Sequence, residues 1–170
     1  MELSRKTLAV LVALGLCGRL VPHPWNFTPM MAIGLYAGAK SAKLHTGIFV
    51  TLLTLLVSDV LLGFYGGMWY VYAASAVPVL IGRFMCRRNG AVSVAAGAVC
   101  SSLSFFITTN FMVWATSNLY PHTAAGLAAC IAAGIPFYRN QVLGDAVYTV
   151  ALFGGGWLIE RLRQPSTQTA

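Results

Sequence analysis

The residues best suited to binding chemistry cluster in one short stretch, Arg19–Pro29, which reads RLVPHPWNFTP. It combines a guanidinium, an imidazole, an indole and an amide with three prolines. Proline fixes φ and removes a backbone donor, so this stretch interrupts the apolar segments on either side of it. A rigid polar loop with aromatic groups forms either a tight turn or the rim of a small-molecule site. We favour the rim, with His23, Trp25 and Asn26 as ligand contacts.

Two carboxylates lie at the ends of apolar segments: Asp59 closes one segment and Asp145 opens another. An ionised carboxylate near a bilayer is costly unless it is paired. Three roles stay open for each acid: an ion pair with Arg19 or Arg139, a ligand contact, or a proton relay. Arg139 follows Pro136 at an expected helix start, where the helix dipole disfavours a cation. It therefore needs an acid or an anionic ligand group as its partner.

The composition excludes an ordinary soluble protein. The chain has 170 residues, of which 58% are hydrophobic and 9% are charged, whereas soluble domains carry about 25% charged residues. We expect an all-α membrane protein with a single transmembrane domain over residues 1–170 and a polar tail at about 164–170. The chain has no phosphate-binding Gly-x-x-x-x-Gly-Lys-Ser/Thr loop and no catalytic cassette, so we expect no ATP hydrolysis by this chain itself and no required cofactor. The four cysteines are widely spaced in apolar surroundings, and we interpret them as buried free thiols.

The apolar runs predict six membrane segments that alternate in direction. Their expected bounds are Thr7–Val21, Pro29–Ala39, Thr46–Gly63, Met68–Phe84, Ala91–Trp114 and Gln141–Ile159. Several are shorter than the ~20 residues that cross a bilayer core, and such segments often mark a cavity. A further apolar piece, Ala124–Ile135, is too short to span, and we expect it to lie across the mouth of the bundle.

The basic residues support this layout. Nine of them fall on one side if six spans alternate: Arg5, Lys6, Lys40, Lys43, Arg83, Arg87, Arg88, Arg161 and Arg163. Only Arg19 and Arg139 fall on the other side. Because basic loops stay in the cytoplasm, both termini are expected there, in the inner membrane of a bacterium. The net charge of +7 therefore reflects topology, and a nucleic-acid partner is not expected.

Polar and aromatic groups gather on the face opposite the basic residues. Interfacial Trp and Tyr commonly form belts in membrane proteins, but the cluster around Trp69 and Tyr72 beside Gly66-Gly67 is also suited to a cavity wall. His23 and His122 lie in separate proline-containing loops, which does not make a metal site. The ligand-binding candidates are His23, Trp25, Asn26, Asp59, Trp69, Tyr72, Asn110, Tyr120 and Arg139.

Several motifs resemble those of a bacterial family of small six-helix membrane proteins, DUF6580. They are NFTP at Asn26–Pro29, SDVLLG at Ser58–Gly63, TNFMVW at Thr109–Trp114, YPHT at Tyr120–Thr123 and PFYRNQVLGD at Pro136–Asp145. The resemblance runs from about Arg19 to Leu158. That family looks similar to the substrate-binding S components of energy-coupling-factor (ECF) vitamin transporters and to solitary cobalamin transporters of the BtuM type.

The resemblance implies a six-helix fold with a vitamin-sized cavity that opens to the outside, and uptake of a vitamin-like substrate. A corrinoid is the first expected substrate. His23, Asp59, Tyr72 and Arg139 are the site residues that the motif match implies. The corrinoid-binding branch presents a cysteine to cobalt just after the Asp-containing segment. This chain has no cysteine from residue 59 to residue 85 and carries Tyr72 there, so a corrinoid would bind without a thiolate.

The resemblance also implies a separate ATPase and scaffold module for energy, unless the protein acts alone. Ala9 and Ala13, with the nearby Gly15 and Gly18, make a small-residue face on the first segment. Such faces let helices approach closely, either within the bundle or against a partner helix.

Two other classes of function stay open from the residues. One is an intramembrane enzyme that uses Asp59, His23 and His122 on a lipid or cofactor. The other is a structural or assembly protein without a ligand, whose bundle would be filled by side chains.

Overall fold

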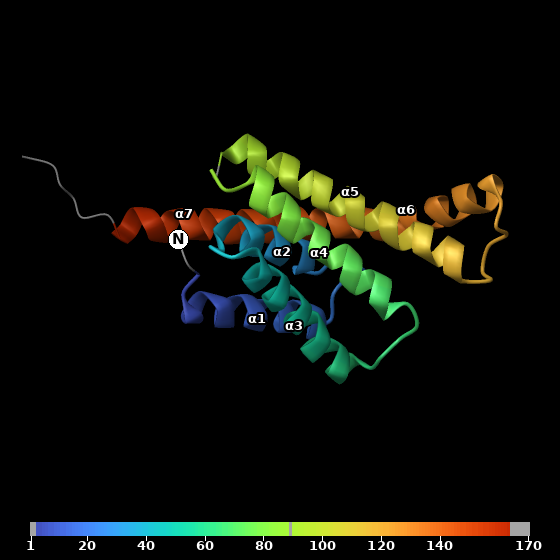
Figure 1. Cartoon of the computed structure of the whole chain (residues 1–170), viewed down its shortest axis with the longest axis horizontal. Helices are drawn as coiled ribbons and strands as arrows, with labels where there is room; N and C mark the ends of the chain where they lie inside the picture. Colours follow the sequence, from blue (N-terminus) through green and yellow to red (C-terminus); the bar gives the residue numbers. More distant parts are fainter. Residues whose placement is uncertain (1–2, 89, 164–170) are drawn as a thin grey trace, which may run out of the picture.

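The computed structural model of the protein describes residues 3–88 and 90–163, and these residues form helices and no strand. The elements are α1 (Arg5–Leu20), α2 (Met30–Lys40), α3 (Leu44–Leu62), α4 (Met68–Met85), α5 (Ala91–Thr116), α6 (Ala124–Thr149), the π-helical turn η1 (Val150–Gly154) and α7 (Gly155–Arg163). The last three are continuous, so the described residues form six helical rods that alternate in direction (Figure 1). The predicted polar tail at 164–170 lies outside the described residues.

Four of the rods are long and apolar enough to cross a membrane: α3, α4, α5 and the continuous rod over Ala124–Leu162. Large apolar side chains such as Phe49, Leu61, Val92 and Val99 are exposed on these helices. An apolar surface of this kind suits lipid rather than water. The chain is therefore a helical membrane protein, as the composition predicts. With 16 and 11 residues, α1 and α2 are shorter.

The first five predicted segments are confirmed as helices, each within two residues at either end. The sixth predicted segment, Gln141–Ile159, lies within a longer helical rod over Ala124–Leu162. The prediction of a separate helix before it was wrong. Residues 124–135 do not form a separate helix across the mouth of the bundle, because α6 continues through Pro136 and leads through η1 into α7.

Contacts with α5 explain why the helix continues through Pro136. Before the proline, the Cys130 thiol donates a hydrogen bond to the backbone carbonyl of Asn110 at 3.4 Å. After it, the ring of Tyr138 packs on Phe106 with centroids 4.5 Å apart. Proline weakens a helix at one turn, and packing on both sides of that turn holds α6 together.

The core is built around α2, where every residue from Met30 to Ala39 is buried. A helix that is apolar all round is stable only when it is surrounded by others, and α2 packs against α3, α4, α5 and α6. Two glycines let α2 and α4 approach closely. A Cβ atom on Gly38 would collide with the backbone carbonyl of Val79, and one on Gly82 would collide with that of Leu35.

Polar contacts tie together the end of the bundle where α1 begins and α7 ends (Figure 1). Lys40, the last residue of α2, donates a hydrogen bond to Glu160 of α7 at 2.9 Å. Arg83, in the last turn of α4, donates to the backbone carbonyls of Ser41 and Ala42 at 2.9 and 3.0 Å. Most of the basic residues therefore gather at this end, which we call the basic end.

Candidate ligand-binding pocket

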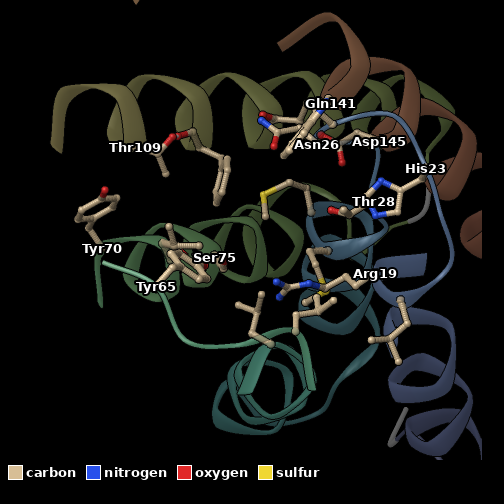
Figure 2. Close-up of a pocket in the computed structure, with 18 of the residues that line it drawn as sticks. Arg19, His23, Asn26, Thr28, Tyr65, Tyr70, Ser75, Thr109, Gln141 and Asp145 are labelled. Atoms are coloured by element: carbon tan, nitrogen blue, oxygen red, sulfur yellow. Dashed lines mark hydrogen bonds between the residues drawn. The ribbon is translucent and has the colours of Figure 1, made fainter. Parts of the chain in front are cut away.

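A pocket of about 740 Å³ lies toward the end of the bundle opposite the basic end. Its walls come from the loop between α1 and α2, the connection between α3 and α4, and the inner faces of α4, α5 and α6 (Figure 2). Met30 and Met31, at the start of α2, also line it. Small-molecule sites usually enclose about 300–1,000 Å³, with mostly apolar walls and a few polar groups, and this pocket has that character.

The loop between α1 and α2 is held against α6. Its backbone at Phe27 and Thr28 lies so close to Gly144 that a Cβ atom there would be 3.2 Å from the Cα of Phe27. Asn26 adopts the left-handed conformation, with φ of 63°, which Asn tolerates better than most residues. This sharp bend places Asn26 beside Gln141 in the pocket wall (Figure 2).

His23 lines the pocket from the same loop. Its Nδ1 lies 2.8 Å from the backbone carbonyl oxygen of Pro24. Because a carbonyl oxygen only accepts, Nδ1 carries the hydrogen. In the neutral imidazole, Nε2 then keeps a lone pair for a ligand.

Arg19, in the last turn of α1, is anchored by a buried carboxylate. Its Nη2 lies 2.5 Å from Oδ1 of Asp59, and Tyr72 donates to the other oxygen of Asp59 at 2.7 Å. Asp59 is fully buried. This contact confirms the ion pair, one of the three roles expected for Asp59. Nη1 of Arg19 is buried and has no hydrogen-bond partner among the described residues.

Asp145, on α6, lines the opposite side of the pocket (Figure 2). The Ser102 hydroxyl of α5 donates a short hydrogen bond to its Oδ2. Gln141, one turn earlier on α6, donates to the backbone carbonyl of Ser102 at 2.9 Å. Among the described residues Asp145 forms no ion pair. Of the three roles left open for this acid, pairing with Arg19 or Arg139 is therefore not the one observed.

Two tyrosines from the α3–α4 side, Tyr65 and Tyr70, line the pocket. Burial, followed by the negative charge of Asp59, raises the pKa of Tyr65 above its ordinary value. Its hydroxyl therefore stays neutral at physiological pH and can both donate and accept hydrogen bonds. Trp69 packs edge-on against Tyr70 with ring centroids 5.4 Å apart, but it is exposed and does not line the pocket.

A comparison with protein-family models gives a match over residues 2–167 to a family described as "Family of unknown function (DUF6580)". The chain belongs to this family. No curated protein and no solved structure matches the chain. The pocket of this DUF6580 member is therefore interpreted from its own geometry.

The structure brings only part of the predicted site together. His23, Trp25 and Asn26 line the large pocket. Asn110 lines an adjoining cavity of about 240 Å³, which shares Trp25, Asn26 and Gln141 with the large one. Asp59 and Tyr72 do not line the large pocket. Asp59 pairs with the pocket residue Arg19, and Tyr72 donates a hydrogen bond to Asp59.

Three other residues from the sequence analysis lie away from this pocket. Tyr120 and His122 belong to the connection between α5 and α6, where His122 packs edge-on against Trp114. Arg139 is exposed on α6 and does not line the large pocket. Its predicted position at a helix start was wrong, because α6 begins at Ala124. Of the two histidines in the enzyme hypothesis, His23 thus lines the pocket and His122 does not.

Several pocket residues were not among the predicted contacts. Arg19 and Asp145 were considered as ion-pair partners, and Tyr70 belongs to the aromatic cluster for which a cavity wall was left open. Met30, Met31, Ser75, Thr109 and Gln141 also line the pocket without having been predicted. For Gln141 the only usable signal was an amide close to Asp145 in an otherwise apolar segment.

Proposed function

We propose that this DUF6580 member is an S-component-like membrane protein that captures a small, vitamin-like molecule and takes it up across the membrane. The observation that supports the proposal is the pocket of about 740 Å³, lined by aromatic groups and by two side chains with unpartnered buried polar atoms, Arg19 and Asp145. A purely structural bundle would be expected to fill this space with side chains.

The proposed orientation places both termini in the cytoplasm of a bacterium, with six helices in the inner membrane. The basic end would then be cytoplasmic under the positive-inside rule. The pocket would face the outside, where a substrate first meets the protein.

Labelling of single cysteines tests this orientation. Cys17 and Cys100 are exposed, so the expectation that all four cysteines are buried was wrong for these two. In a background with both replaced by serine, Asn118→Cys should react in intact cells with a membrane-impermeant maleimide. Lys43→Cys should react only after the cells are permeabilised. Both positions are exposed and lie in connections at opposite ends of the bundle. The reverse pattern would overturn the orientation.

Cobalamin or a related corrinoid is the first substrate to test. The described residues that line the pocket include no cysteine, so cobalt would not be held by a thiolate. The free Nε2 of His23 is the nitrogen ligand that the pocket offers instead. The tyrosines, Trp25 and the two methionines would pack against the ring system, since ligand pockets combine apolar packing with a few polar anchors.

Thermal unfolding of the purified protein with a panel of vitamins, including cobalamin and cobinamide, tests the proposal. A ligand present at 100 times its Kd adds about 2.7 kcal/mol to the stability, so Tm should rise visibly. Trp25→Ala should reduce this rise without lowering the Tm of the free protein, because Trp25 lines the pocket and is 77% exposed. Trp157→Ala is the matched control, because Trp157 lies on α7 near the basic end.

A folded protein whose Tm no vitamin changes would remove the support for uptake of this class of substrate. Formation of product from a lipid or cofactor by the purified protein would then favour the enzyme hypothesis.

The energy source is proposed to be either a separate ATPase and scaffold module or none, with the protein acting alone. Ala9 and Ala13 are exposed on α1 and would receive such a module. Gly15 and Gly18 face the bundle instead, where they pack closely against Thr54 and Pro29 respectively.

A further inference from the structure

Asp145 is a buried acid whose hydrogen bonding is incomplete. It is 2% exposed, and only its Oδ2 has a partner, the Ser102 hydroxyl. Oδ1 has no hydrogen-bond partner among the described residues. A buried carboxylate is costly unless it is paired and hydrogen-bonded, so this oxygen requires a partner that the described chain does not supply.

The nearby basic groups do not supply it. Arg19 lines the same pocket, but its charge is already balanced by Asp59 at 2.5 Å. Arg139 lies six residues before Asp145 on α6, which turns it about 240° around the helix axis, and it is exposed. The Nδ1 of His23 is directed to its own loop at Pro24.

The surroundings of Asp145 suit a positively charged group. Figure 2 shows its carboxyl group facing the interior of the pocket, while Tyr65 and Tyr70 line the far side, away from Asp145. A cationic nitrogen in this space could donate a charge-assisted hydrogen bond to a carboxylate, which is about twice as strong as a neutral one.

We infer that Asp145 is the anchor for a cationic nitrogen of the captured molecule: an ammonium, an amidinium or a protonated ring nitrogen. This inference rests on the proposed function, because it names the chemical class of the substrate for the same pocket. The unpartnered Nη1 of Arg19, across the pocket, is suited to donate a hydrogen bond to an oxygen of the same molecule.

The charge in the pocket can be measured without knowing the substrate. Thr109 lines the pocket on α5, two helical turns from Ser102, which is about 10 Å along the axis. In a background with Cys17 and Cys100 replaced by serine, Thr109→Cys is labelled with two methanethiosulfonates, one bearing trimethylammonium and one bearing sulfonate. Each rate is normalised to the rate with a free thiol in solution, so that the intrinsic reactivities of the reagents cancel.

The normalised ratio of cationic to anionic labelling should fall about fivefold or more when Asp145→Asn is added, because a charge within about 10 Å acts strongly where water is scarce. Asparagine keeps the shape and an acceptor for Ser102, so the fold should persist. Glu160→Gln is the matched control, since it removes a carboxylate at the basic end, where Glu160 pairs with Lys40. It should leave the ratio unchanged.

A ratio that Asp145→Asn does not change would overturn the inference. A corrinoid that raises Tm alongside an unchanged ratio would keep the proposed function and remove only the cation anchor. If the ratio falls in Asp145→Asn but no vitamin raises Tm, Asp145 would remain a cation anchor. The proposal of a vitamin-like substrate would then be removed.

Discussion

Replacing Asp59 with alanine is expected to lower the free energy of unfolding by about 3–5 kcal/mol, which is typical when one partner of a buried ion pair is removed. Asp59 is fully buried and is held by Arg19 at 2.5 Å and by the Tyr72 hydroxyl at 2.7 Å. Without it, a guanidinium whose side chain is 13% exposed loses its counter-charge. Unfolding of the protein in detergent, followed by circular dichroism, measures the loss.

Two variants separate the charge from the packing in this cluster. Tyr72→Phe removes one hydrogen bond to a charged acceptor and should lower the stability by about 1.5–3 kcal/mol. The double substitution Arg19→Met with Asp59→Leu removes both charges and keeps apolar volume, so it should be clearly more stable than Asp59→Ala. An Asp59→Ala protein as stable as the wild type would show that the pair does not hold the bundle together.

The second large effect is expected at the crossing of α2 and α4. Gly82→Ala places a methyl group against the backbone carbonyl of Leu35, and Gly38→Ala places one against that of Val79. Backbone atoms cannot rotate away as a side chain can, so the two helices must separate. Each substitution should lower the stability by about 1–3 kcal/mol or more, as measured by the shift in Tm of the purified protein.

Gly154→Ala is the matched control for this pair, because a Cβ atom there has nothing within 4 Å. It should change Tm little. If Gly82→Ala were tolerated as well as Gly154→Ala, close approach of α2 and α4 would not be a requirement of the fold.

The sequence predicted the first five helices well because helix-breaking or charged residues separate the apolar runs, such as Pro29, Gly63 and the basic clusters. The same reasoning failed at Pro136, where packing against α5 outweighs the missing hydrogen bond. A helix-breaking residue marks a helix end when the chain leaves the bundle at that residue. It does not mark an end when the helix packs against a neighbouring helix both before and after it.

The candidate site was only partly predictable for a related reason. His23, Trp25 and Asn26 could be found because polar residues in a proline-rich loop have few structural roles. The pairing of arginines with acids depends on how each helix is rotated and how deep it lies in the bundle. A single sequence does not give these two quantities. Met30 and Met31 could not be distinguished from core residues, since both uses favour the same apolar side chains.

The shortness of α2 has a consequence for the distance that a captured molecule must still travel. Met30 and Met31 line the pocket at one end of α2, and Lys40 lies at its other end, among the basic groups. With 11 residues, α2 measures about 16 Å along its axis, against about 30 Å for the hydrocarbon core. In the proposed orientation, a molecule that rests on these methionines would have passed about half of the membrane barrier before any helix moves. The rest of α2, from Ala32 to Lys40, would then be the barrier that remains beneath it.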